Sequence, residues 1–294
     1  MILPNPPAPG SPEWHKAITA SKVPAILGLS PWASPYSVWV SMTTGADPIE
    51  ETAAMKRGTY LEGGILDWYE ADHPDLVPAG RQLAYTLGDD KTCFSTTDGN
   101  YWTPAGDLEI VEVKTVGRDD DWRDEDGGWR VPDYYLAQVM FQLATSQASR
   151  AVVVALTPHL EKVEIPVERD LDLEAAIVEE IHLFQQALED GIVPDLDDHV
   201  ATYDAVRRRH SKIDGSTVEV PFTVAHTWLD ARDVKDRAEA AERAAKTRLL
   251  DLMGEARLAT SEGLTIAMRS PGRGDIVTLR PKAKAADLEA RAWA

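Results

Sequence analysis

Two acidic residues and a lysine on neighbouring predicted strands are the residues of this 294-residue sequence best suited to chemistry. The segment 108–114 reads LEIVEVK and predicts a strand. Because alternate residues of a strand face the same side, Glu112 and Lys114 project together while Val113 points to the other face. Asp98 ends the preceding predicted strand just before a glycine, so it can lie alongside them.

Two carboxylates beside a lysine are costly to bury in a sheet. A hard divalent cation relieves that cost, because Mg²⁺ prefers carboxylate oxygens together with water and phosphate. Lys114 would then orient, or help to deprotonate, a water nucleophile, which is the layout for metal-assisted phosphodiester hydrolysis. On these three residues alone, an exposed hairpin with cross-strand charge pairs is the alternative, since D-x(n)-E-x-K is common by chance.

Further motifs surround this core. In chain order they are TASK at 19–22, AILGLSPW at 25–32, SPYSVW at 34–39, MKRGTYLE at 55–62, TDG at 97–99, EVK at 112–114 and YLAQVMFQ at 135–142. In this order and spacing they resemble the YqaJ-type viral recombinase family, the phage lambda exonuclease-like branch of the PD-(D/E)XK nucleases. The resemblance covers about residues 13–200 and, more weakly, the end of a long predicted helix at 252–254.

The resemblance implies a three-layer, restriction-endonuclease-like α/β core with a central mixed sheet flanked by helices. It implies Mg²⁺-dependent 5′-to-3′ digestion of one strand of linear double-stranded DNA, with Mn²⁺ as a substitute metal, which exposes 3′ single strands for recombination. A ring-shaped homotrimer around DNA and a single-strand annealing protein as partner are implied in the same way.

The resemblance also assigns roles at the predicted site. Asp98 and Glu112 match the metal-binding carboxylates, the carbonyl of Val113 a further ligand, and Lys114 the residue that orients the attacking water. Glu62 matches an added acidic residue that helps to hold metal or water, although a solvated helix carboxylate is the alternative.

Two polar residues complete this set. Gln138 matches a glutamine that completes the active site, and a helix-packing amide is the alternative. Ser21 matches a serine near the terminal 5′-phosphate, and a helix cap is the alternative.

The early part of the chain departs from the family pattern. Family members commonly place a 5′-phosphate-binding arginine after the early tryptophan, where this chain offers only Lys16, a point charge without arginine's two-pronged fit to phosphate. The preference for a 5′-phosphorylated end is therefore not implied. Arg57 and Arg130 are the candidates that would compensate.

Charge and cysteine content limit the alternatives. The chain carries 30 Lys+Arg against 49 Asp+Glu, a net charge of −19, which excludes a uniformly basic DNA-coating protein. The single cysteine, Cys93, excludes a disulfide scaffold and a cysteine-ligated iron–sulfur cluster, and it fits a reducing cytoplasm. No apolar run approaches the roughly 20 residues that a membrane helix needs, so no membrane role is expected.

The remaining alternatives are a catalytically weak DNA-end-binding module and a related PD-(D/E)XK endonuclease.

The apolar periodicity predicts an α/β chain. Helices are expected at 19–27, 34–42, 50–70, 134–146 and 171–188, and strands at 82–87, 92–97, 108–116, 151–156 and 160–167. The proline-rich segment Met1–Pro12 predicts a flexible arm. Trp32, Trp39 and Trp68 have apolar neighbours and are interpreted as core residues rather than base-stacking residues.

A shift in charge predicts two domains, a nuclease domain at 1–222 and a C-terminal arm at 223–294, because the acidic excess lies before the boundary. The arm is expected to hold a long helix at 226–253, a β-hairpin at 264–280 and a loosely ordered tail. The helix carries a stripe of apolar residues spaced by three and four, namely Ala231, Val234, Ala238, Ala241, Ala245, Leu249 and Leu252. The stripe predicts packing on its own domain, with contact between protomers as the alternative.

Overall fold

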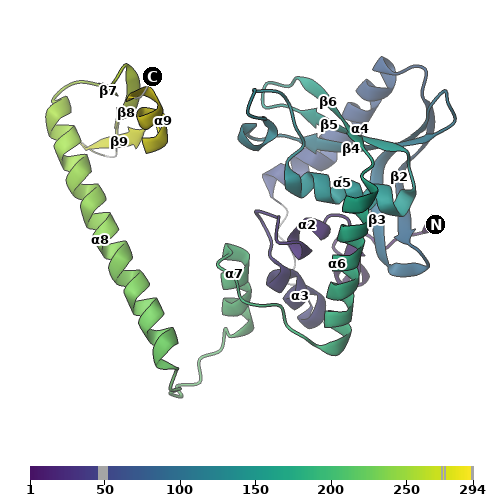
Figure 1. Cartoon of the computed structure of the whole chain (residues 1–294), viewed down its shortest axis with the longest axis horizontal. Helices are drawn as coiled ribbons and strands as arrows, with labels where there is room; N and C mark the ends of the chain where they lie inside the picture. The colour runs from purple at the N-terminus through teal and green to yellow at the C-terminus, as the bar shows by residue number, and fades with distance from the viewer. Residues whose placement is uncertain (46–51, 273, 275, 293–294) are drawn as a thin grey trace. The chain divides into compact units, whose positions relative to one another are not determined.

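The computed structural model describes residues 1–45, 52–272, 274 and 276–292 and divides into two compact units, Met1–Lys212 and Ile213–Ala294 (Figure 1). The charge pattern placed the boundary at residue 222, whereas the structure divides after Lys212. Within the described ranges, the helices all lack the combination of length and apolar character that crossing a bilayer requires.

The first unit is a mixed sheet between helices. Its elements are α1 (Pro12–Lys16), β1 (Ile18–Thr19), α2 (Val23–Ile26), α3 (Pro35–Thr44), α4 (Ala53–Asp72), β2 (Val77–Leu87), β3 (Asp90–Trp102), β4 (Leu108–Thr115), the 3₁₀ helix η1 (Asp120–Trp122), α5 (Asp133–Ser146), β5 (Arg150–Leu156), β6 (Lys162–Glu168), α6 (Leu171–Asp190) and α7 (Val200–Arg209). The strand order is β1-β3-β4-β5-β6, with β2 also paired to β3. The β1–β3 and β4–β5 pairs are parallel and the others antiparallel.

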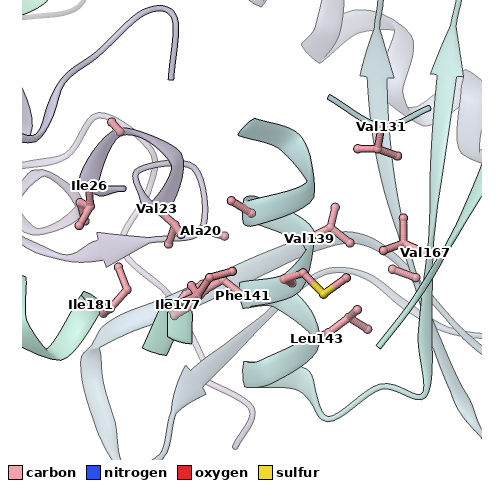
Figure 2. Packing of buried hydrophobic residues seen from close by; sticks show 14 of the residues in the cluster. Ala20, Val23, Ile26, Val131, Val139, Phe141, Leu143, Val167, Ile177 and Ile181 are labelled. Atoms are coloured by element: carbon pink, nitrogen blue, oxygen red, sulfur yellow. The ribbon is translucent and has the colours of Figure 1, made fainter. Parts of the chain in front are cut away.

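Alternation along the central strands decides which helices cover which face. On β5, Val152 and Val154 pack with Leu66 of α4, whereas Val153 packs on the opposite face with Phe141 of α5. Figure 2 shows the larger core on that second face, built from Val23 and Ile26 of α2, Val139, Phe141 and Leu143 of α5, and Ile177 and Ile181 of α6. Helices on both sides of one mixed sheet confirm the predicted three-layer α/β architecture.

The N-terminal arm is ordered, contrary to the prediction. The Leu3 N–H donates to the Ala84 carbonyl at 2.8 Å, and the Thr86 N–H donates to the Met1 carbonyl at 2.9 Å. The first three residues precede the prolines, so they retain the backbone donors with which to pair along β2.

Two predicted helix positions need correction. The helix expected at 19–27 is reduced to α2, after β1. The helix expected from residue 50 begins at Ala53, where the Thr52 hydroxyl accepts from the Met55 N–H at 3.2 Å, and residues 50–51 lie outside the described part. Helix α7 was not predicted.

The three tryptophans interpreted as core residues differ in exposure. Trp39 is 7% exposed, but Trp32 is 64% exposed and Trp68 is 44% exposed. The interpretation is right for Trp39 and wrong for the other two.

The second unit contains α8 (Phe222–Met253), β7 (Leu258–Ser261), β8 (Leu264–Pro271), β9 (Val277–Pro281) and α9 (Ala285–Ala292). The predicted hairpin is the β8–β9 pair, and β7 adds a third antiparallel strand beside β8. Helix α9 overturns the expected loose tail, of which residues 293–294 lie outside the described part.

The apolar stripe of α8 is largely uncovered within its own unit. Leu249, in the last turn, packs with Met253, Ala259 and Ala267 on the small sheet. The earlier stripe positions, from Ala231 to Ala245, find no such cover in the unit. Leu252, at the end of the helix, is 84% exposed, so packing on its own domain accounts for Leu249 only.

A fully buried carboxylate ties α4 to the sheet. Glu109 on β4 is 0% exposed, accepts from the Tyr69 hydroxyl at 2.7 Å and pairs with Arg150 on β5. Burial and the bond to Glu109 raise the pKa of Tyr69, so its hydroxyl remains a donor. Since a buried carboxylate is tolerated only when partnered, this network fixes α4 over β4 and β5.

Removing one side chain at a time should lower the free energy of unfolding of the first unit by amounts that depend on how buried the lost contact is. Tyr69→Phe is expected to lower its free energy of unfolding by about 1–2 kcal/mol, and Glu109→Ala by more, since both partners then lose their acceptor. Asp67→Ala removes an exposed partner of Arg81 and should cost under about 1 kcal/mol. Urea unfolding measures all three, and equal losses for Tyr69→Phe and Asp67→Ala would contradict the assigned role of the network.

Candidate active site

The site begins where β3 and β4 separate. Their ladder ends at the Gly99–Val111 pair, while β2 stays paired with β3 on both sides of that point. The Asp98 carboxylate takes the place of the missing ladder bond, because its Oδ2 accepts from the Val113 N–H at 2.7 Å. The end of the strand pairing thus holds Asp98 against β4.

Glu112 is the buried centre of the site, with 5% exposure. Its Oε1 accepts from Gln138 Nε2 at 2.6 Å and from Lys114 Nζ at 2.5 Å, and Gln138 Oε1 accepts from Lys114 Nζ at 3.3 Å. The strand alternation predicted Glu112 and Lys114 on one face, and they meet α5 there. The structure therefore brings together Asp98, Glu112, Lys114 and Gln138.

Gln142 also belongs to this group, although no role was predicted for it. It is fully buried, and its Nε2 donates to Glu112 Oε2 at 2.6 Å and to the Thr96 carbonyl at 2.9 Å. It lies one helical turn after Gln138 and so on the same face of α5. That four-residue spacing between two amides on an otherwise apolar helix was the available signal.

Gln82, on β2, links the remaining predicted acid to the site. Its Nε2 donates to Glu62 Oε1 at 2.5 Å and to Asp98 Oδ1 at 3.2 Å. Burial raises the pKa of Glu62; the Gln82 hydrogen bond opposes the rise and the charge of Glu112 adds to it. Sequence analysis missed Gln82, because its position at the start of the predicted strand carries no chemical pattern.

The site holds more negative charge than its lysine neutralises. Burial, Glu112 and Glu62 raise the pKa of Asp98 well above its ordinary value, and Lys114 offsets only part of this. Burial alone would lower the pKa of Lys114, but the charges of Glu112, Tyr135 and Asp98 and the hydrogen bond to Glu112 together outweigh it, and the pKa lies above its ordinary value. The ammonium, 4.5 Å from the centre of the Tyr135 ring, is therefore a donor rather than a base.

The chemistry of the donor set fits a hard cation, although the acids are not gathered around one. Glu112, Asp98 and Glu62 repel one another, and a divalent ion would relieve that repulsion. Across residues 1–45, 52–272, 274 and 276–292, no three His, Cys, Asp or Glu side chains converge as a ready-made metal site. Both Glu112 oxygens face amide or ammonium donors instead.

The predicted DNA-contact residues occupy different places. The exposed Arg57 lies beside Gly117, just past the end of β4, where a Cβ on that glycine would be 3.7 Å from its guanidinium. Lys16 lines a cavity of about 330 Å³ with Ser41. The Ser21 hydroxyl bonds Thr19 at 3.1 Å and caps no helix. Of the three, Arg57 thus lies just past the end of β4 that carries Lys114.

Residues 13–149 match the sequence profile of the YqaJ-like viral recombinase domain. The uncharacterized protein YqaJ of Bacillus subtilis (strain 168) is 25% identical over 211 residues, which cover 69% of this chain and 63% of that protein. The chain thus spans less than two thirds of the length of this relative.

The fold is similar to that of an alkaline exonuclease, LHK-Exo, from Laribacter hongkongensis. Its crystal structure superposes with a TM-score of 0.51 and 20% identity, covering 68% of this chain and 98% of that one. A second structure of that enzyme, in complex with dAMP, gives the same score and identity over 68% and 96% of the two chains. At this identity the likeness shows a shared fold.

Neutralising one of the crowded acids should stabilise the metal-free protein. Asp98→Asn removes a half-buried acid that Glu112 and Glu62 repel, and it is expected to raise Tm in EDTA by a few degrees, about 1 kcal/mol. Millimolar Mg²⁺ should raise the Tm of the wild type and leave that of Asp98→Asn unchanged. Differential scanning calorimetry checks both, and an equal Mg²⁺ shift in the two proteins would place the cation elsewhere.

Proposed function

We propose that this chain, whose residues 13–149 match the YqaJ-like viral recombinase domain, is a phage-type exonuclease. In this proposal it digests one strand of linear double-stranded DNA in the 5′-to-3′ direction, depends on Mg²⁺, accepts Mn²⁺ as a substitute and leaves 3′ single strands for recombination. The observation that carries the proposal is the meeting of Asp98, Glu112, Lys114 and Gln138 where β3 and β4 separate.

The side chains divide the work of hydrolysis. Lys114, kept protonated by Glu112, donates to the attacking water or to a phosphate oxygen and so fixes the line of attack. Gln138 contacts both Glu112 and Lys114, and Gln142 holds the second oxygen of Glu112, so the two amides orient the pair. Both lie on α5, whose apolar face is packed in the core, which gives them a rigid support.

The proposed cation would be held by Asp98, Glu112 and the Val113 carbonyl, with Glu62 assisting. When bound, it would supply charge stabilisation at the scissile phosphate and a more acidic water. The similarity in fold to LHK-Exo, an enzyme also crystallised with dAMP, supports a nucleotide-binding role for this site.

Two alternatives follow from specific observations. The donors already facing both oxygens of Glu112 favour a DNA-end-binding module that has lost hydrolysis. A related endonuclease would use the same carboxylates and lysine, but it would cut closed circular DNA as well as linear DNA.

Partners and assembly are proposed from the resemblance. A single-strand annealing protein would receive the exposed 3′ strand, and a homotrimer would enclose the duplex. Work in the cytoplasm of a host cell is proposed from the resemblance as well. The single thiol, Cys93, is fully buried, and burial raises its pKa to about 12, so it is unreactive.

Removal of the lysine tests the catalytic assignment. Lys114→Ala should lower the rate of nucleotide release from linear duplex DNA in Mg²⁺ by at least about 100-fold, because the water loses its oriented donor. Duplexes labelled at the 5′ or the 3′ end, with and without EDTA, give the rate, the polarity and the metal dependence. Lys91→Ala, an exposed lysine at the start of β3, serves as the matched control.

The outcomes separate the three functions. A Lys114→Ala protein that digests DNA at the wild-type rate would refute the site. Retention of DNA without nucleotide release by the wild type in Mg²⁺ or Mn²⁺ would favour the binding module. Nicking of closed circular DNA would favour the endonuclease.

Arg57 is the candidate phosphate contact that lies just past the end of β4. Arg57→Ala is expected to raise KM for 5′-phosphorylated duplexes about 10-fold or more, because a charge-assisted contact is lost, and to leave kcat within about threefold. Arg118→Ala removes a more exposed arginine that is paired with Asp120, and it should change neither value. Equal KM effects on phosphorylated and unphosphorylated ends would contradict a role in phosphate recognition.

A further inference from the structure

Trp32 is an exposed aromatic residue on a fixed turn. It lies between α2 and α3, where the Ser30 hydroxyl accepts from the Trp32 N–H at 3.2 Å and from the Ala33 N–H at 3.3 Å. Ser34 then caps α3 through the Ser37 N–H at 3.1 Å. The backbone is therefore held in place while the indole keeps 64% of its surface exposed.

A chain of ring contacts joins this indole to the proposed catalytic lysine. The Trp32 ring lies edge-on to Tyr134, with centroids 5.1 Å apart, and 6.0 Å from the centroid of Tyr135. The Tyr135 ring in turn lies 4.5 Å from Lys114 Nζ and 5.5 Å from the ring of the buried Trp122. The aromatic patch, defined as Trp32, Tyr134 and Tyr135, thus borders the site directly.

The charges around the patch indicate which part of a nucleic acid it suits. The Tyr134 hydroxyl donates to Asp121 at 3.3 Å, and Asp133 opens α5 beside it in a pair with Arg130. Carboxylates repel phosphate, so this surface is poorly suited to the DNA backbone. An uncharged nucleobase meets no such repulsion and presents a π-face that stacks on an indole.

We propose that Trp32, supported by Tyr134, is a stacking surface for a nucleobase of the DNA strand that enters the site beside Lys114. The inference rests on the proposed nuclease function and deepens it. In this arrangement Lys114 and Arg57 contact the phosphates, and the aromatic patch stacks on a base. The strand is held from two sides, and the contact is indifferent to sequence because every base has a π-face.

The test combines protein and DNA substitutions. KM and kcat are measured in Mg²⁺ for duplexes with normal bases and for duplexes with an abasic nucleotide at each of the first few positions of the digested strand. Trp32→Ala should raise KM on normal DNA by about 5- to 100-fold, the range for loss of one stacked base. On DNA abasic at the stacked position, wild type and Trp32→Ala should have equal KM values, and Trp32→Phe should restore most of the affinity for normal DNA.

Two controls keep the result interpretable. Trp102→Ala removes a tryptophan that is 46% exposed at the far end of β3, and its KM should match the wild type on every duplex. Circular dichroism checks the fold, which the loss of an exposed side chain on a turn should spare. An unchanged KM for Trp32→Ala, or the same penalty on normal and abasic DNA, would overturn the inference.

Failure of the proposed function is a different result. If the wild type digests no DNA, that function is refuted, and fluorescence anisotropy with the same labelled duplexes replaces the kinetic readout. The same criterion then applies: the effect of Trp32→Ala must vanish on abasic DNA, and an effect that persists there overturns the inference.

Discussion

The first unit is organised around a carboxylate that lies almost out of solvent on a central strand. Glu112 needs donors for both oxygens, and they come from its strand neighbour Lys114 and from two amides one turn apart on α5. The same helix buries its apolar side, including Phe141, in the main core. Two interactions therefore fix the rotation of α5 about its axis: the packing of its apolar face in the core and the hydrogen bonds of its amides to Glu112. Both favour the same orientation of the helix.

Much of this arrangement is readable from the sequence, for definite physical reasons. The two-residue period of a strand places Glu112 and Lys114 on one face. A continuous apolar run such as 151–156 indicates a strand that is covered on both faces. Gln142 escaped notice because an amide on an apolar helix has the same pattern whether it packs or binds. Gln82 was not predicted because its contacts to Glu62 and Asp98 depend on how α4 lies over the sheet. Local sequence periodicity does not encode that arrangement.

The solvent exposure of individual side chains was the feature that the sequence predicted least well. Trp32 and Trp39 both have apolar neighbours in the chain, yet one is 64% exposed and the other 7% exposed. The difference comes from the turn at Ser30, which directs one ring outwards, and from α3, which directs the other into the core. The apolar stripe of α8 makes the same point, since its spacing describes a face and does not say what covers that face.

The separation of β3 from β4 has a consequence for how this protein tolerates change. Because Asp98 takes up the Val113 N–H where the ladder stops, the register of β4 fixes the site and the core at once. A one-residue deletion in the 103–107 turn would shift β4 by one position, presenting Val113 to the amides of α5 and Glu112 to the apolar face of α4. Length variation is thus barred from that turn, whereas residues 124–128, which are exposed and belong to none of the described strands, remain open to insertions.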